Sequence, residues 1–244
     1  QMCIRDRLKQ AFPNITSIKQ NINNSHSNVI MGQQSATLYG KDKIVDQLSD
    51  ITFKISDQSF YQINSSQTEK LYQKAIDYAQ LDGQEIVLDT YCGIGTIGLY
   101  MAPVAKHVYG VEVVPSAIKD ARQNALVNDL HNTTFVCGKA EDVIMDWQRE
   151  GIQPDVVMVD PPRKGCEAQF IQTLLDLNPE RIVYISCNPS TQQRDAHMLA
   201  TQYDLKEITP VDMFPQTTHI ETVALFKKKP VSYTHLTLPT IYSV

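Results

Sequence analysis

The amino-acid sequence predicts a doubly wound α/β domain, in which a mostly parallel sheet carries helices on both faces. Three observations favour this fold class. From residue 66 onward, apolar strand segments alternate with helical segments, as in parallel sheets that are covered on both sides. A glycine-rich turn connects one of these strands to the helix that follows it. The last two strands have no helix between them, so we expect them to pair as an antiparallel hairpin.

The predicted elements follow one another in a regular order. Ser66 is expected to cap the first helix, with Glu69 completing a capping box and Leu71 and Ala75 on the apolar face. Apolar runs predict strands at Glu85–Asp89, Val108–Val113, Thr134–Gly138, Asp155–Asp160, Arg181–Cys187, Leu205–Val211 and Glu221–Lys227. Helical spacing predicts helices near Ile97–Ala102, Ser116–Asn128, Ala140–Trp147, Ala168–Asp176 and Ser190–Ala200.

The N-terminal quarter of the chain has a different character. Residues 8–65 are β-leaning, and alternating apolar residues predict strands at Ile51–Ile55 and Phe60–Ile63. This segment is too short for a substantial core of its own, so we interpret it as the remnant of a larger β-rich domain. The α/β domain then spans residues 66–230.

Both ends of the chain look foreign to the rest. The opening segment, residues 1–7, and the closing segment, residues 231–244, resemble translated adapter sequence more than the ends of a domain. We interpret both as non-native and leave them out of the fold.

Composition excludes several classes of protein. Apolar residues make up 42% of the 244, but runs such as Ile182–Cys187 are far shorter than the ~20 residues of a membrane-spanning helix. Five cysteines without a C-x-x-C pair predict no disulfide framework, zinc site or iron–sulfur cluster. We therefore expect a cytoplasmic protein without membrane or metal.

The net charge of −5 is unevenly distributed. Residues 1–66 contain seven Lys and Arg against five Asp and Glu, whereas residues 67–230 contain fifteen against twenty-two. The second part is thus strongly acidic, which by itself argues against a polyanionic partner.

The glycine-rich turn runs from Asp89 through Gly93, Gly95 and Gly98. Three glycines at this spacing allow a tight turn and a close approach to a ligand, and Glu112 at the end of the next strand is placed to accept from ribose hydroxyls. The alternative is that the glycines serve packing alone. A carboxylate at Asp89 would repel a dinucleotide's pyrophosphate but attract the sulfonium and ammonium groups of S-adenosylmethionine, so the sequence favours that cofactor.

A second motif, D-P-P-R-K-G, begins at Asp160, where the fourth strand ends. The two prolines restrain the backbone, so Asp160 can present an acceptor to a cofactor or a base. Arg163 and Lys164 add two cations of the kind that contact RNA phosphates. An ordinary surface loop is the alternative.

Cys187 and Glu221 are the candidate catalytic pair. Cys187 follows an apolar strand and precedes a polar turn, which favours a nucleophile over a small core residue. Glu221 begins the final strand, and if that strand is antiparallel, Glu221 faces Cys187 at the edge where the parallel strands end. A solvated strand end would explain Glu221 equally well.

Five segments, in this order, closely resemble the RNA (uracil-5-)-methyltransferases. They are F-Y-Q-I-N at Phe60–Asn64, D-T-Y-C-G-I-G-T at Asp89–Thr96, D-P-P-R-K-G at Asp160–Gly165, S-C-N-P at Ser186–Pro189 and H-I-E-T-V at His219–Val223. The resemblance covers roughly residues 8–230 and fits best the bacterial 23S ribosomal RNA branch without an iron–sulfur cluster. It implies a class I methyltransferase, Rossmann-like sheet.

The resemblance also implies roles for individual residues. The positions that bind the cofactor would be Gln62, Tyr91, Glu112 and Asp160. Cys187 would be the nucleophile, and Glu221 would be the base that removes the C5 proton. Related proteins carry a small barrel and further central-domain residues before the position of Leu8. We therefore expect that missing part to contain much of the RNA-binding surface.

The resemblance, with Cys187 and Glu221 at one edge, implies a three-step reaction. A cysteine thiolate adds to uracil C6, C5 is methylated, and the C5 proton is removed. A local feature must then help to ionise Cys187, and we expect the N-terminus of the helix near Ser190 to do so. Transfer RNA stays open as the substrate. A nicotinamide-dependent oxidoreductase explains only the glycine turn, and a non-catalytic RNA-binding paralogue leaves the catalytic pair unexplained. We expect a monomer.

Overall fold

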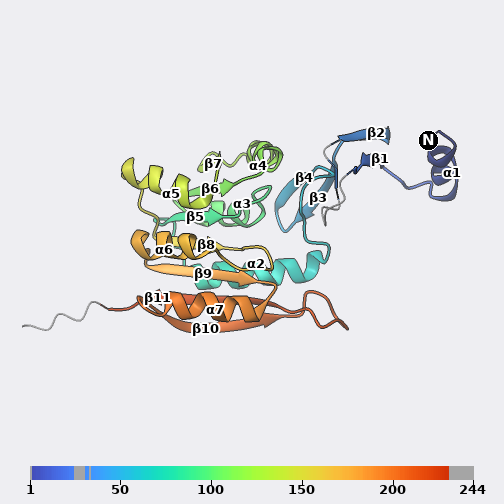
Figure 1. The fold of residues 1–244 in the computed structure, drawn as a ribbon. Helices are drawn as coiled ribbons and strands as arrows, with labels where there is room; N and C mark the ends of the chain where they lie inside the picture. Colours follow the sequence, from blue (N-terminus) through green and yellow to red (C-terminus); the bar gives the residue numbers. More distant parts are fainter. Residues whose placement is uncertain (1, 25–30, 33, 231–244) are drawn as a thin grey trace, which may run out of the picture.

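A seven-stranded sheet forms the centre of the computed structural model, which describes residues 2–24, 31–32 and 34–230 (Figure 1). The strand order is β10-β11-β9-β8-β5-β6-β7. The strands span β5 (Ile86–Thr90), β6 (His107–Glu112), β7 (Thr133–Cys137), β8 (Val156–Val159), β9 (Arg181–Ser186), β10 (Tyr203–Val211) and β11 (Glu221–Lys228). The five from β5 to β9 are parallel, and β11 pairs antiparallel with both β9 and β10. The predicted fold class and the C-terminal hairpin are confirmed.

Helices cover both faces of this sheet. They span α2 (Ser65–Ala79), α3 (Thr96–Met101), α4 (Pro115–Val127), α5 (Ala140–Arg149), α6 (Ala168–Leu177) and α7 (Pro189–Leu199), with a 3₁₀ turn at Ala102–Val104. Side chains from α2, α3 and α4 pack in one apolar cluster, and side chains from α5, α6 and α7 pack in another. Strand residues supply both clusters alternately: Met158 of β8 faces the first cluster and Val157 faces the second.

The first helix of the domain is capped differently from the prediction. It begins at Ser65, and the N-cap is Asn64, whose side chain accepts a hydrogen bond from the backbone N–H of Gln67. The predicted cap at Ser66 is therefore wrong, because the carboxylate of Glu69 binds the backbone N–H and hydroxyl of Ser49 instead of closing a capping box. Asparagine is as good an N-cap as serine, so Asn64 can take the role that was predicted for Ser66.

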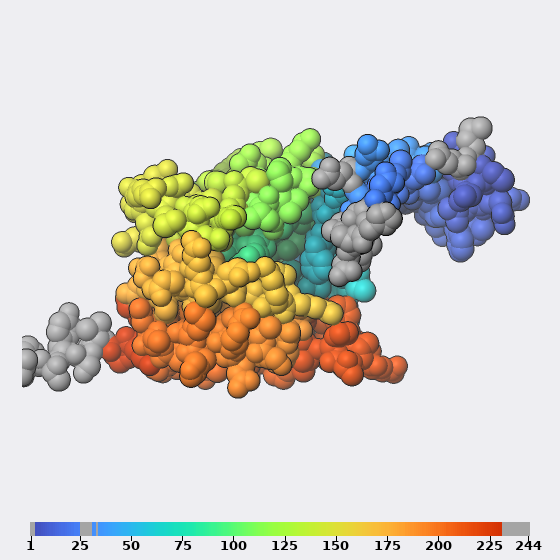
Figure 2. Space-filling model, viewed as in Figure 1, coloured from blue at the N-terminus to red at the C-terminus, as the bar shows by residue number. Residues whose placement is uncertain are grey.

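The N-terminal part consists of α1 (Met2–Ala11), β1 (Ser17–Ile22), β2 (Gln34–Gly40), β3 (Ile44–Leu48) and β4 (Ile51–Ile55). β1 pairs with β2, and β3 pairs with β4, each antiparallel. Figures 1 and 2 show α1 and the β1–β2 hairpin extending away from the sheet domain. The helix α1 crosses the predicted boundary at residue 7, and residues 231–244 lie outside the described residues.

The β3–β4 hairpin belongs to the same apolar core as the sheet domain. Leu48 and Phe53 are fully buried there, together with Leu71 of α2. Phe60–Ile63, predicted as a strand, is irregular instead. Phe60 and Ile63 are largely exposed, so their alternation with polar residues does not reflect a strand with one buried face.

Asn124 of α4 and Asn128, the C-cap residue of that helix, bind the free edge of β4. Asn128 accepts from the Thr52 N–H at 2.7 Å and donates to the Thr52 carbonyl at 2.7 Å. One turn earlier, the fully buried Asn124 accepts from the Lys54 N–H at 2.8 Å. Residues four apart on a helix share a face, so the two amides together replace the neighbouring strand that β4 lacks. This is how the hairpin is held on the sheet domain.

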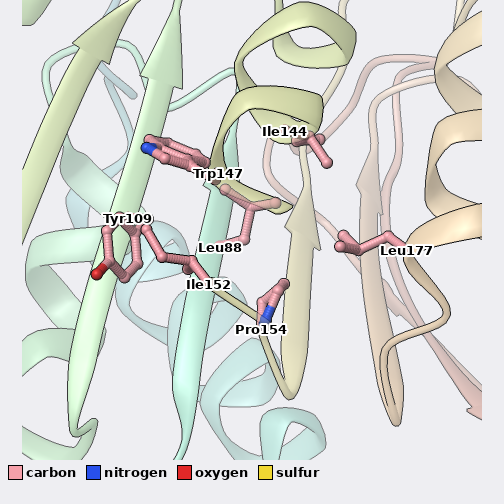
Figure 3. Close-up of a pocket in the computed structure, with 7 residues that line it drawn as sticks. All are labelled: Leu88, Tyr109, Ile144, Trp147, Ile152, Pro154 and Leu177. Atoms are coloured by element: carbon pink, nitrogen blue, oxygen red, sulfur yellow. The ribbon is translucent and has the colours of Figure 1, made fainter. Parts of the chain in front are cut away.

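A small apolar gap lies between α5 and the sheet, lined by Leu88, Tyr109, Ile144, Trp147, Ile152, Pro154 and Leu177 (Figure 3). Its volume is about 10 Å³, which leaves room for at most a single water molecule. It is a packing defect of the second cluster and not a ligand site. None of the helices in the described part of the chain has the length and apolarity needed to cross a membrane.

Candidate active site

The carboxyl ends of the parallel strands meet at one edge of the sheet. Tyr91 follows β5, Asp160 follows β8 and Cys187 follows β9, while Glu112 is the last residue of β6. In sheets of this kind ligands bind outside these ends. The topology therefore brings to one edge the residues that the sequence analysis singled out.

The turn after β5 has a left-handed backbone at three positions, with φ values of 61° at Tyr91, 54° at Gly93 and 82° at Gly95. Only glycine adopts this region without strain, so Tyr91 is held there by its surroundings. A Cβ at Gly93 would meet no atom within 4 Å, which means that the turn presents bare backbone to open space. Tyr91 packs edge-on against Phe170, with ring centroids 5.3 Å apart.

Asp89 lies beneath this turn. Its side chain is fully buried, and Oδ2 accepts from the Gly98 N–H at 2.8 Å. Oδ1 has no hydrogen-bond partner in the described part of the chain. Burial raises the pKa of Asp89 to about 8, against the opposing effect of the Gly98 bond. Asp89 thus fastens α3 to β5, and a direct contact with a cofactor stays a prediction.

Glu112 and Tyr91 line a cavity of about 570 Å³. Glu112 accepts from the Gly93 N–H at 3.3 Å and from the Val114 N–H at 3.0 Å, which fixes its carboxylate beside the turn. Lys164 also lines this cavity, and its ammonium is paired with Glu167 at 2.6 Å. The other lining residues are Val111, Val113, Gly138, Lys139, Ala140, Glu141, Pro162, Gly165, Ala168 and Gln169.

The predicted site residues do not all share that cavity. Gln62, Asp160, Gly93 and Gly95 are not among its lining residues. Gln62 is half-buried in the segment between β4 and α2. That segment is fastened near the end of β10, because the side chain of Asn64 donates to the carbonyl of Met213 at 2.9 Å.

Glu221 lies beside Cys187. In the antiparallel register of β11 and β9, Thr222 pairs with Ser186, so the residue before Thr222 lies opposite the residue after Ser186. The register is reinforced by the Thr222 hydroxyl, which is 3.3 Å from the Ser186 carbonyl and donates to it. Glu221 is 5% exposed and Cys187 is half-buried. The sequence-based placement of these two residues at one edge agrees with this geometry.

Burial and mutual repulsion weaken the acids at this edge. Burial raises the pKa of Glu221 to about 7, while Arg163 opposes the shift. Burial also raises the pKa of Asp160 to about 7, and the charge of Glu221 adds to it. Two carboxyl groups that both resist ionisation indicate a place where a cationic ligand would be stabilised.

The thiol of Cys187 is not activated in this state. Burial raises its pKa, Glu221 and Asp160 raise it further, and Arg163 opposes them. The helix α7 does begin two residues after Cys187, with the Asn188 side chain accepting from the Ser190 N–H at 3.1 Å. The contribution of this helix N-terminus to ionising the thiol stays a prediction.

Sequence reasoning missed the polar residues of α7 and of its N-cap that hold the D-P-P-R-K-G loop. The side chains of Asn188, Thr191, Arg194 and Asp195 all bind backbone groups of residues 163–166. The signal that could have found them is their spacing, because residues 191, 194 and 195 share one helix face directly after the cysteine turn.

Comparison with known proteins places these features in context. The tRNA (Uracil-5-)-methyltransferase family matches residues 14–229. An uncharacterized RNA methyltransferase of Staphylococcus epidermidis is 80% identical over 224 residues, which are 92% of this chain and 49% of that protein. One from Staphylococcus aureus (strain COL) is 77% identical over the same shares. The chain thus spans about half the length of the curated relatives it matches.

Solved structures show the same fold. The Pyrococcus abyssi tRNA (uracil-54, C5)-methyltransferase in complex with S-adenosyl-L-homocysteine is 34% identical, with a TM-score of 0.73, and covers 89% of this chain and 52% of its own. The M. jannaschii tRNA m1G37 methyltransferase is 15% identical, with a TM-score of 0.61, over 81% of this chain and 61% of its own. The second likeness concerns the fold alone.

Proposed function

The chain belongs to the tRNA (uracil-5-)-methyltransferase family, and from this premise we propose that it transfers a methyl group from S-adenosylmethionine to C5 of a uridine in RNA. The observation that carries the proposal is the register of β11 on β9, which sets the buried carboxyl of Glu221 beside the thiol of Cys187. Family membership leaves the nicotinamide-dependent oxidoreductase without support.

The residues present fit S-adenosylmethionine. The cavity of about 570 Å³ beside the glycine turn is large enough for an adenosyl group, and Glu112 is fixed at its wall, where ribose hydroxyls can be bound. Tyr91 would form an aromatic wall, and Gly93 and Gly95 would let the backbone approach. Asp89 and Asp160, whose pKa values burial raises, would supply negative potential once a nearby cation favours their ionised forms. When bound, this cofactor supplies the methyl group on a positively charged sulfur.

Cys187 and Glu221 would carry the chemistry on the base. Uracil C5 is a weak nucleophile, so the Cys187 thiolate adds to C6 and the electron pair moves to C5 and O4. C5 would then take the methyl group that the bound cofactor would supply, and the electron pair of the broken bond would leave with the cofactor. Glu221 removes the C5 proton, and the electrons of that bond restore the C5–C6 double bond as the Cys187 thiolate leaves. A base with a pKa of about 7 suits a proton transfer near neutral pH.

A cation near the site would help to form the thiolate. The charges that raise the pKa of Cys187 come from Glu221 and Asp160, and a sulfonium beside them would offset both. We therefore propose that Cys187 is activated when the cofactor is present, and that Arg163 contributes to this effect.

For the RNA substrate we propose 23S ribosomal RNA, as the motif resemblance implies. Transfer RNA is the second candidate, because the family description and the P. abyssi relative both refer to it. We propose that Arg163 and Lys164 contact the phosphate backbone, and that the protein acts in the cytoplasm as a monomer.

The test uses S-adenosylmethionine labelled on its methyl group, with 23S ribosomal RNA and bulk transfer RNA as separate substrates. Nuclease digestion and mass spectrometry should find label in 5-methyluridine. Label in transfer RNA alone would favour the second candidate, whereas label in another nucleoside, or in neither RNA, would contradict the proposed function.

A further inference from the structure

The loop after β8 is fastened to α7 through the backbone groups of three of its residues. Thr191 Oγ1 donates to the Arg163 carbonyl at 3.3 Å, and Arg194 Nη2 donates to the carbonyls of Lys164 at 3.1 Å and Cys166 at 3.0 Å. The Cys166 N–H donates to Asp195 Oδ2 at 2.8 Å. A loop without secondary structure thereby acquires a defined position against one helix.

Asp195 is the centre of this arrangement. Its side chain is 1% exposed, and its two oxygens also accept from the Tyr184 hydroxyl at 2.7 Å and from Arg194 Nε and Nη2 at 2.8 and 2.7 Å. Tyr184 lies in β9, three residues before Cys187. Asp195 therefore joins the strand that leads to Cys187 with the loop that carries Arg163.

The contact is close enough to require a glycine. Gly165 has a φ of 75°, and a Cβ there would lie 2.7 Å from Arg194 Nη2 and 2.7 Å from Asp195 Oδ2. A side chain at this position would require the Arg194 guanidinium or the Asp195 carboxylate to shift, and its positive φ would be strained. The backbone of the loop at Gly165 is thus in direct contact with the side chains of Arg194 and Asp195.

Arg163 is the residue whose position matters most for the site. The backbone of Arg163 lies next to the Cys187 turn, because Asn188, the residue after Cys187, donates to the Arg163 carbonyl at 3.2 Å. The charges that act on the Cys187 thiol are those of Glu221 in β11, Asp160 after β8 and Arg163 in the loop. Arg163 is the cation among them, and it acts on Glu221 as well. Its guanidinium has no ion pair in the part of the chain that the structure describes, so its place is set by its backbone, which Asn188 and Thr191 bind at the carbonyl.

We infer that Arg194 and Asp195 are positioning residues that hold the loop after β8 so that Arg163 lies beside Cys187 and Glu221. The inference rests on the proposed role of Cys187 as nucleophile. It adds to that role two residues that touch neither the cofactor nor the base, and act through Arg163.

Alkylation of Cys187 tests this without RNA or cofactor, so its outcome does not depend on methyl transfer. The rate of reaction with iodoacetamide is measured against pH, and the modified peptides are quantified by mass spectrometry. The exposed Cys137 provides an internal reference. If Arg194→Gln releases the loop, the midpoint for Cys187 should rise by roughly half a pH unit, which is about threefold less thiolate at a fixed pH below it.

A double-mutant cycle separates positioning from a general structural effect. Arg163→Gln should itself raise the midpoint, and Arg194→Gln should then add nothing. Arg149→Gln, which removes an exposed ion pair with Asp146 on α5, is the matched control and should leave the midpoint unchanged. An unchanged midpoint in Arg194→Gln, or an equal rise with and without Arg163, would overturn the inference.

Thr191→Val decides the question if Arg194→Gln does not fold. Valine keeps the shape of threonine and removes the hydroxyl that binds the Arg163 carbonyl. We expect a smaller midpoint shift in the same direction, again absent when Arg163 is replaced. A folded Thr191→Val protein with an unshifted midpoint would overturn the inference.

Discussion

Thr222 of β11 lies opposite Ser186 of β9 in an antiparallel register. The Thr222 hydroxyl also lies 2.8 Å from Gln192 Oε1, and the amide of Gln192 donates to the Tyr184 carbonyl at 3.0 Å. Two strands and the helix α7 are thereby locked around one pair of residues. The adjacent positions, Glu221 and Cys187, inherit this rigidity, which is what a nucleophile and its base require.

The cofactor assignment predicts selective stabilisation by S-adenosylmethionine and S-adenosylhomocysteine. At one hundred times the dissociation constant, either should add about 2.7 kcal/mol to the free energy of unfolding, measured by thermal or urea denaturation. NAD should add nothing, and stabilisation by NAD alone would refute the assignment.

Glu112→Ala should weaken cofactor binding, because this carboxylate is fixed beside the turn by the Gly93 and Val114 N–H groups. Glu207→Ala, on the exposed part of β10, is its control. Titration calorimetry should show weaker binding for the first variant only.

The docking of the β3–β4 hairpin predicts a stability loss in Asn128→Ala. This change removes both bonds to Thr52 and leaves a backbone N–H without its partner, which costs about 1–3 kcal/mol. Gln172→Ala removes one exposed side-chain bond to Asp176 and should cost less than about 0.5 kcal/mol. Equal urea midpoints for the two variants would show that α4 does not hold the hairpin.

The raised pKa of Asp89 predicts a pH-dependent stability. An acid whose pKa rises from its ordinary value to about 8 on folding binds its proton more tightly in the folded state. Its stabilising effect is complete below the unfolded pKa and is lost as pH rises towards 8, at up to about 1.4 kcal/mol per pH unit.

Asp89→Asn should remove this loss while keeping an oxygen for the Gly98 N–H. Urea unfolding at pH 5 and pH 8 should show a smaller fall for Asp89→Asn than for the wild type. The exposed Asp146→Asn should fall as the wild type does. Identical falls in all three proteins would mean that Asp89 is not the group that titrates.

The acidic charge of residues 67–230 predicts weak RNA binding by this chain, which spans about half the length of its curated relatives. Extending it to the full length of those relatives should lower the KM for RNA and steepen its salt dependence, by roughly 0.7–0.9 in logarithmic slope for each added phosphate contact. The kcat should stay within a few-fold. An unchanged KM and salt slope would place the recognition surface within residues 8–230.

Much of the fold could be predicted because hydrophobic periodicity reports burial. Each strand and helix predicted from residue 85 onward begins and ends within about two residues of the observed element. The same signal failed at Phe60–Ile63, where apolar residues are exposed, because periodicity cannot tell a buried side chain from one left at the surface of a site.

Cys187 and Glu221 could be placed together because strand direction alone determines which ends share an edge. The hydrogen-bond network around Asp195 could not be predicted, because it depends on backbone carbonyls of a loop whose position the sequence does not reveal. The raised pKa of Cys187 was equally out of reach, because it reflects two carboxylates from β8 and β11 that only the fold brings together.

The covalent step is the central claim, and one measurement tests it most directly. Glu221→Gln keeps the nucleophile but lacks the base. Cys187 should therefore add to uracil C6 and C5 should be methylated, but the covalent adduct should not be released. Incubated with RNA and S-adenosylmethionine, it should give an RNA-linked band on a denaturing gel, and mass spectrometry should find methylated uridine on the peptide that contains Cys187. Cys187→Ala should abolish methyl transfer, and the double variant should give no band. A band that persists without Cys187, or full activity of Cys187→Ala, would contradict the account.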